Sequence, residues 1–239
     1  MRWALANKNL DNYMNARRFV CLLGLCVFFL TRLDAQAWEL CFEASGYLTN
    51  QVCIPPGHSL IAGPLVHVAP DTYPLGFGNE NQVSNLFPQM PFGTRLYKFN
   101  SQTGEFSENR FGRNGWGNPA ETLAPGEGAI IFNPTRQTIN VDFSGYNTAS
   151  GQIHLRRGWS LIGSVYTSLG PFVFSGSTWF ECNTKFYVED GDIICTFNQT
   201  QRKFEKHKYH TATGWDSYPS MGWNESFWVF TKHPRTIGF

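Results

Sequence analysis

The sequence predicts an all-β protein made of two tandem, internally duplicated β-units. Short apolar runs rich in Ile, Val, Phe, Tyr and Trp are interrupted about every eight to twelve residues by Gly, Pro, Asn or Asp, a pattern typical of short strands joined by turns. The same series of short motifs also occurs twice, about a hundred residues apart. We therefore expect units shaped as a small sandwich or barrel, with few or no helices after the N-terminal segment.

The duplication rests on four landmarks that follow one another in the same order in both halves. Their first and second occurrences are Pro56–Gly63 and Arg157–Ser164, Tyr97–Asn100 and Cys195–Asn198, Gly115–Trp116 and Gly214–Trp215, and Glu127–Phe132 and Glu225–Phe230. The offsets are 101, 98, 99 and 98 residues, so each copy is expected to place its landmarks at equivalent points of one supersecondary unit. The expected organisation is a lead-in at residues 38–54, copy 1 at 55–145, a junction at 146–152 and copy 2 at 153–239.

Strands are expected where the apolar runs are clearest. These runs are Thr94–Asn100, Ala129–Asn133, Thr138–Phe143, Asp192–Asn198 and Ser226–Thr231. A polar turn follows the first and the fourth of them, which predicts matching hairpins at Phe99–Phe106 and Phe197–Phe204. Because matched strands must hold one register, we expect burial of the apolar pairs Leu60–Ile61 and Leu161–Ile162.

The N-terminal segment has the three parts of a secretory signal peptide. An unbroken apolar run of twelve residues, Phe19–Leu30, follows Arg17–Arg18 and precedes small residues that suit cleavage near Ala37. The run is shorter than the roughly 18 to 20 residues needed to span a bilayer, so residues 1–37 are expected to leave without forming a stable membrane anchor. Translation from Met14 would give this signal a more compact start. The mature chain is expected in the periplasm or outside the cell.

Composition excludes one class of partner. Removing residues 1–37 takes away five of the 19 Lys and Arg and two of the 18 Asp and Glu, which leaves 14 against 16 and a net charge of about −2. Nucleic acids are held through clustered Lys and Arg side chains that neutralise their phosphates. A chain without a general basic field is not expected to bind them.

Four of the six cysteines stay in the mature chain, namely Cys41, Cys53, Cys182 and Cys195. An even number in an exported chain favours disulfides, and of the three pairings, Cys41 with Cys53 and Cys182 with Cys195 closes the shortest loops. A two-residue hairpin at Asp190–Gly191 would set Cys195 opposite Phe186, so the second bridge needs an irregular segment. Four free thiols are the alternative. A zinc site is not expected, because no CxxC or paired His-Cys spacing is present.

The order of motifs in copy 1 is carried by Gly93–Asn100, Gly115–Trp116 and Leu123–Pro134. Together with Gly158–Gly163 it resembles a repeated module of secreted bacterial proteins, abundant in environmental phyla such as the Verrucomicrobia, over about residues 55–239. Such modules usually lack an assigned activity. The resemblance therefore implies secretion, tandem β-units and an unknown ligand, and it carries over no catalytic residue. Two positions depart from the module: His58 replaces an aromatic residue, and Met221–Ser226 replaces a Pro-Gly-Glu-Gly turn.

Aromatic residues make up 16% of the chain, and flat indole faces can stack on sugar rings. For Trp159 and Trp228 we expect a place in the thin core of a small β-unit. For Trp116 and Trp215 two interpretations stay open, because each follows Gly in polar surroundings: a core position, or an exposed position that binds a glycan. If the protein binds a glycan, these two residues are expected to supply most of the affinity.

Lys206 and Lys208 lie in the local basic cluster Arg202–His210. On a strand their side chains share one face, and His207 falls on the other. Two interpretations stay open here as well: a patch that binds anionic polysaccharide, or a solvated edge strand whose lysines oppose aggregation. No metal ligand set and no other cofactor is expected.

Glu127 and Glu225 occupy matched positions, and paired carboxylates carry out glycoside hydrolysis when they lie about 5 to 9.5 Å apart. Each, however, begins a buried strand after a turn, where a carboxylate can accept backbone N–H bonds. No catalytic residue is therefore nominated. The leading hypothesis is a secreted, non-catalytic β-repeat protein that binds an extracellular polysaccharide or a component of the cell envelope. The alternative is a secreted hydrolase that acts on polysaccharide.

Overall fold

The computed structural model describes residues 47–67, 81–147, 152–163, 172–173, 188–222 and 224–238, all within one compact unit, Ala44–Phe239. The expected signal peptide, Cys41 and Cys182 lie outside the described residues. In the part of the chain that is described, no helix is long and apolar enough to cross a membrane. The fold is all-β, as predicted, with one short helix, α2 at Val83–Leu86, among the described residues.

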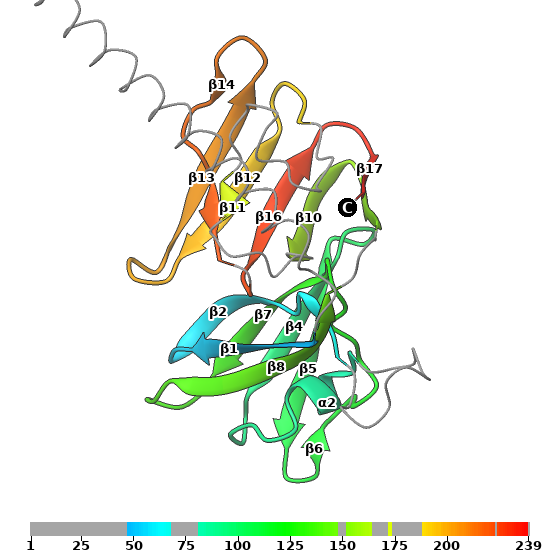
Figure 1. Cartoon of the computed structure of the whole chain (residues 1–239), viewed down its shortest axis with the longest axis vertical. Coiled ribbons are helices and arrows are strands. Elements are labelled where there is room, and N and C mark those ends of the chain that lie inside the picture. Colours follow the sequence, from blue (N-terminus) through cyan, green and yellow to red (C-terminus); the bar gives the residue numbers. More distant parts are fainter. Residues whose placement is uncertain are drawn as a thin grey trace, which may run out of the picture. The chain divides into compact units, whose positions relative to one another are not determined.

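Two five-stranded antiparallel sheets form the frame of this unit (Figure 1). Sheet 1 has the order β2 (Gly57–Ala62), β7 (Gly128–Asn133), β4 (Arg95–Asn100), β5 (Glu105–Gly112) and β6 (Gly115–Trp116). Sheet 2 has the order β10 (Gly158–Gly163), β16 (Ser226–Thr231), β12 (Ile193–Asn198), β13 (Lys203–His210) and β14 (Gly214–Trp215). Strands β4, β7, β12 and β16 confirm four of the five expected runs, and β8 (Ile139–Asn147) confirms the fifth, Thr138–Phe143.

The two sheets share their register as well as their strand order. In β2 and β7, Gly57 pairs with Asn133, and 101 and 98 residues further on, Gly158 of β10 pairs with Thr231 of β16. Both expected hairpins are present, since β4 joins β5 with Phe99 opposite Phe106 and β12 joins β13 with Phe197 opposite Phe204. A slip of one residue in either sheet would turn every side chain to the other face. Matched residues of the two sheets therefore point to matched faces.

One face of each sheet covers a hydrophobic core, and we call it the inner face. The core of sheet 1 is closed by α2 and by two paired strands, β1 (Tyr47–Ile54) and β8 (Ile139–Asn147). A short strand, β3 (Leu65–Val66), pairs with β8. The last eight residues of the expected lead-in thus form β1 and pair with β8 along their whole length. Buried members of this core are Val52, Ile54, Ile61, Val83, Leu86, Phe87, Met90, Leu96, Trp116, Leu123, Ala129, Ile131 and Phe143.

The core of sheet 2 lies beside two further strands, β9 (Gln152–Leu155) and β17 (Arg235–Gly238), which pair with each other. Its buried members are Leu155, Ile162, Ile194, Trp215, Phe227, Val229 and Ile237. Two short strands, β11 (Phe172–Val173) and β15 (Ser220–Met221), also pair. The predicted burial of Ile61 and Ile162 is confirmed. Leu60 and Leu161 are buried too, but they point to the opposite face and belong to neither core.

The two sheets touch through matched positions. The backbone N–H of Ala62 donates to the carbonyl of Asn224 at 2.8 Å, and that of Gly163 donates to the carbonyl of Gly126 at 3.0 Å. Ala62 and Gly163 end matched strands, and Gly126 and Asn224 lie in matched turns, so the two bonds are reciprocal. A side chain at Gly163 would meet the Cβ of Ala62 at 2.4 Å. The contact is therefore close enough to require glycine on one side.

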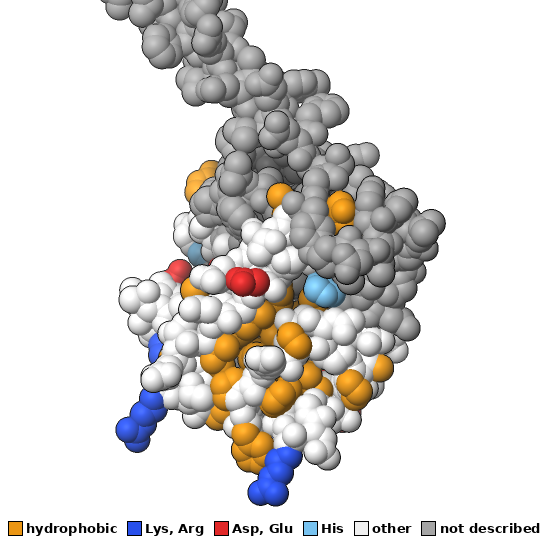
Figure 2. All heavy atoms as spheres, turned by 60° about the horizontal axis from the view of Figure 1, so that its bottom comes forward, with side chains coloured by type: hydrophobic (Ala, Val, Ile, Leu, Met, Phe, Trp, Pro, Cys, Tyr) orange, Lys and Arg blue, Asp and Glu red, His pale blue; other side chains and the backbone are white. Residues whose placement is uncertain are grey.

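Hydrophobic side chains also reach the surface. Figure 2 shows a group of them on the face that comes forward when the lower end of Figure 1 is turned to the viewer, with a few lysine and arginine side chains at its margin. The large exposed hydrophobic residues of the described part are Phe92, Phe106, Trp159, Phe204 and Tyr218. Scattered exposure of this kind is normal for a folded protein. A hollow that such side chains line is more informative about binding.

Candidate functional site

The face of sheet 2 that points away from its core carries a row of aromatic side chains, and we call this the outer face. Ile162, Ile194 and Val229 point into the core, so their neighbours in sequence point outward, because side chains alternate along a strand. The outward side chains of the four longer strands include Trp159, Cys195, Phe197, Phe204, Trp228 and Phe230. Trp159 is 39% exposed and Phe204 is 54% exposed, so this face is open to a ligand in the described part of the chain.

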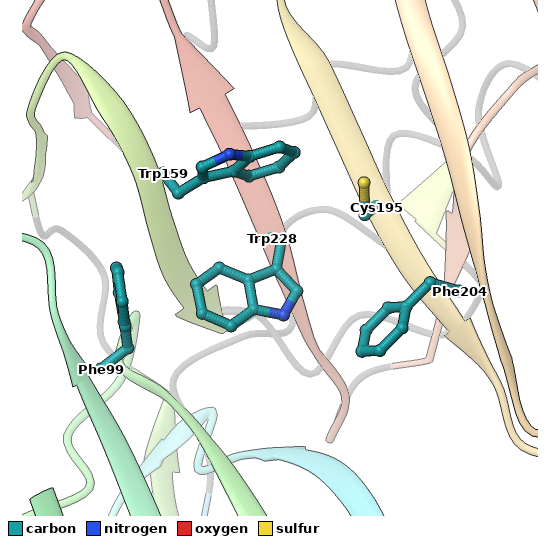
Figure 3. Close-up of a pocket in the computed structure, with 5 residues that line it drawn as sticks. All are labelled: Phe99, Trp159, Cys195, Phe204 and Trp228. Carbon is teal, nitrogen blue, oxygen red and sulfur yellow. The ribbon is translucent and has the colours of Figure 1, made fainter. Parts of the chain in front are cut away.

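A groove of about 340 Å³ lies where this outer face meets sheet 1. Its walls are Phe99, Trp159, Cys195, Phe204 and Trp228. Figure 3 shows Phe99 approaching from β4 of sheet 1, while the other four side chains come from the four longer strands of sheet 2. None of the five carries a charge. Their only polar groups are two indole N–H groups and a thiol, so the groove suits an apolar surface.

The aromatic rings hold one another in place. The ring centre of Trp228 lies 4.8 Å from that of Phe99 and 6.4 Å from that of Trp159, with interplanar angles of 73° and 88°. Phe106 adds a third edge-to-face contact with Trp228, at 5.9 Å. Such perpendicular contacts stabilise each ring pair by about 0.5 to 1.5 kcal/mol beyond the burial of area. The groove is therefore formed before any ligand arrives.

The tryptophan pair is particular to sheet 2. The matched positions of sheet 1 carry His58 in place of Trp159 and Ile130 in place of Trp228. His58 packs against Phe132, with ring centres 4.8 Å apart. Because His58 departs from the repeat pattern, the outer face of sheet 1 has an imidazole where that of sheet 2 has the indole of Trp159.

Trp116 and Trp215, the two tryptophans considered for glycan binding, are buried, with 6% and 8% exposure. Of the two interpretations left open for these residues, the core position is confirmed. The core position expected for Trp159 and Trp228 is wrong, because both side chains lie on the outer face and line the groove. Gly115 leads Trp116 into β6, whose pairing with β5 turns the indole toward the inner face. There its Nε1 donates to the carbonyl of Phe87 at 2.9 Å. A sequence signal that bears on Trp159 is its spacing from Ile162. The two residues lie three positions apart on one strand, so their side chains point to opposite faces.

Cys195 is a free thiol, as is Cys53, which is exposed on β1. No disulfide is present among the described residues, and the predicted partners Cys41 and Cys182 lie outside them. The side chain of Cys195 points into the groove, and its neighbours across the sheet are Lys206 and Trp228. Burial raises the pKa of the Cys195 thiol, and the Lys206 ammonium lowers it by a smaller amount. The thiol therefore stays protonated near neutral pH and is a poor nucleophile.

Lys206 and Lys208 share the outer face of β13 with Phe204, as the strand pattern predicted. His207 points inward and is buried, where its ring lies 2.8 Å from the hydroxyl of Ser217 and 3.3 Å from that of Thr196. In the described residues, no group of three or more His, Cys, Asp or Glu side chains could hold a metal ion. The two lysines thus lie on the same face of sheet 2 as the groove.

Glu127 and Glu225 have the same structural role in their two turns. The carboxylate of Glu127 accepts from the backbone N–H of Ala124 at 2.8 Å, and that of Glu225 accepts from Gly222 at 2.8 Å. The sequence departure at Met221–Ser226 therefore keeps this hydrogen bond of the matched turn. Glu127 also accepts from the Lys98 ammonium at 2.9 Å. Neither carboxylate lines the aromatic groove.

Comparisons of this chain with protein-family models, with curated proteins and with solved structures return no match.

Proposed function

We propose that this chain is a non-catalytic binding protein of the extracellular space or cell envelope, and that the groove between the sheets is its ligand site. The observation that carries the proposal is the convergence of Phe99, Trp159, Phe204 and Trp228 on one open hollow. Single exposed rings are normal, whereas a contiguous group of large apolar rings on the surface is typical of a binding site. Rings that are already held by their neighbours lose little entropy on binding, which favours affinity.

The alternative of a polysaccharide hydrolase finds no comparable support. Glycoside hydrolysis needs two carboxylates across the bond to be broken. The five groove residues include no carboxylate, and the matched pair Glu127 and Glu225 is bound to its own turns. Binding without chemistry is the function that this set of side chains can perform.

Export is the second part of the proposal. It is supported by the apolar run Phe19–Leu30 with Arg17–Arg18 before it and Ala37 after it. Mass spectrometry of the protein collected outside the cytoplasm should find an N-terminus at or near Trp38. An exported protein that retains Phe19–Leu30 would contradict this part of the proposal and leave the groove untouched.

Ligand binding can be followed by tryptophan fluorescence, since two indoles line the groove. We expect Trp159→His to reduce the affinity for any ligand that binds there by tenfold or more, because a smaller ring replaces the more exposed of the two groove indoles. The variant should fold, because the matched position of sheet 1 already carries His58. Phe92→Ala is the control, since Phe92 is 64% exposed and is not among the groove residues. Equal affinities for the wild type and Trp159→His, with both proteins folded, would contradict the groove as the ligand site.

A further inference from the structure

The edge of the groove on sheet 2 is cationic. Across the pair β12 and β13, Phe197 lies opposite Phe204, Cys195 opposite Lys206, and Ile193 opposite Lys208. Side chains directly opposite each other on antiparallel strands have Cβ atoms about 4.5 to 5.5 Å apart. Since Cys195 is part of the groove wall, Lys206 lies at its rim, with Lys208 two residues further along the same face.

Lys206 lacks the ion-pair partner that its counterpart on sheet 1 has. The position matched to Lys206 is Glu108, which forms an ion pair with Arg95 at 3.5 Å. The position matched to Arg95 is Ile193, so that arrangement is lost on sheet 2. Among the described residues, no ion pair involves Lys206 or Lys208.

Two acidic residues close to these lysines in the sequence, Glu205 and Asp216, form other contacts. Glu205 points to the other face and accepts from the side-chain amide of Asn198 at 2.8 Å. Asp216 accepts from the backbone N–H groups of Lys208 and Ser217, at 2.9 and 2.7 Å. Within the described part of the chain, neither lysine ammonium group is paired with a carboxylate, so both can meet an anion from outside.

We infer that the groove takes an amphipathic anion, whose apolar body lies against Trp159, Trp228 and Phe99 and whose carboxylate or other anionic group lies beside Lys206 and Lys208. This inference rests on the proposed function of the groove. A neutral sugar fits less well, because a wall of hydrocarbon would leave its hydroxyl groups without hydrogen-bond partners. An apolar chain with one charged end needs only the aromatic wall and the two ammonium groups.

The test compares three ten-carbon probes, decanoate, decan-1-ol and decyltrimethylammonium. The two ions are kept below the concentration at which they form micelles, and the alcohol is kept below its solubility. Tryptophan fluorescence of the full mature chain should give the tightest binding for decanoate and the weakest for the cation. Raising the ionic strength from about 0.02 M to 0.5 M should weaken decanoate binding severalfold and leave decan-1-ol unchanged, because salt screens charges at the surface.

Matched variants separate the charge from the groove. Lys206→Gln with Lys208→Gln should reduce the affinity for decanoate about tenfold and leave that for decan-1-ol unchanged. Lys203→Gln is the control, since Lys203 is on the same strand but three residues from Lys206, so the two side chains point to opposite faces. Equal effects of Lys203→Gln and Lys206→Gln on decanoate would overturn the inference.

Two further outcomes distinguish this inference from the proposed function. Decan-1-ol or the cation binding as tightly as decanoate, with a loss in Trp159→His, would leave the groove as a binding site and overturn its preference for an anion. Binding that Trp159→His does not change would overturn both.

Vesicles of neutral lipid, with and without phosphatidylglycerol, identify the source of the ligand. Binding to the anionic vesicles but not to free decanoate would assign the site to a lipid in a membrane, and binding to decanoate alone would assign it to a free acid.

Discussion

Replacing Gly163 with alanine is expected to weaken the contact between the two sheets. The new Cβ would lie 2.4 Å from the Cβ of Ala62 and 2.6 Å from the carbonyl oxygen of Glu127. Both distances are below 3.0 Å, the separation that Cβ atoms in proteins essentially never undercut. One of the two obstacles is backbone, so it cannot rotate away, and the strands themselves must separate.

The size of the effect follows from two contributions. Forcing an extra methyl group into a packed contact costs about 1 to 3 kcal/mol. Separation of the strands also lengthens the hydrogen bond from the Gly163 N–H to the Gly126 carbonyl, now 3.0 Å, and a bond of this kind is worth about 1 kcal/mol. The expected loss in the free energy of unfolding is therefore about 2 to 4 kcal/mol.

Urea unfolding of the mature chain, followed by circular dichroism, measures this loss as a lower midpoint at an unchanged slope. Gly112→Ala is the control, because the nearest atom to its new Cβ is the carbonyl oxygen of Gly115, at 3.7 Å. That variant should stay within about 0.5 kcal/mol of the wild type. Equal midpoints for Gly163→Ala and Gly112→Ala would refute the close contact between the sheets.

Three other changes test the cores and the groove. Ile61→Ala should cost about 2 to 5 kcal/mol in a thermal melt, since Ile61 is 1% exposed in the core of sheet 1; an unchanged melt would mean that the core is misplaced. Asp192→Ala should lower the free energy of unfolding by about 3 to 5 kcal/mol. The Arg235 guanidinium would lose the fully buried carboxylate that now lies 2.8 Å away. The exposed Asp142→Ala is its control, and an equal loss in both variants would contradict the role of the buried pair. The alkylation rate of Cys195 should keep rising with pH beyond the point where the alkylation rate of glutathione reaches its plateau, because burial raises the pKa of the Cys195 thiol. A plateau at a lower pH than that of glutathione would contradict this.

The strands could be predicted from the sequence because their signals are local. The pairs Phe99 with Phe106 and Phe197 with Phe204 each enclose a short polar turn, and both hairpins form as expected. The shared register of the two sheets follows from the constant spacing of their motifs. Strand pairing between segments that are far apart in the sequence gives no local signal of this kind. The pairing of β1 with β8, for example, joins the N-terminal strand to the end of the first half of the unit.

The candidate site was harder to predict, because it depends on which face of each sheet the core covers. The alternation of side chains along β10 shows that Trp159 and Ile162 point to opposite faces. It does not show which of the two faces covers the core. Trp116 was ambiguous because its Gly-Trp turn looks exposed, while the pairing of β6 with β5 carries the indole inward. The groove itself needs Phe99 of sheet 1 to approach Trp228 of sheet 2 to 4.8 Å between ring centres. Such an approach depends on how the two sheets pack.

Protection of Cys195 from alkylation would show whether a ligand occupies the groove. Cys195 lines the groove, and Cys53, exposed on β1, serves as an internal control on the same molecule. Peptide mass spectrometry after a timed exposure to iodoacetamide, with and without saturating decanoate, gives the rate at each thiol. We expect bound ligand to slow the alkylation of Cys195 severalfold and to leave Cys53 unchanged. Decanoate that binds, as judged by an independent method, yet leaves both rates unchanged would contradict the groove as the ligand site.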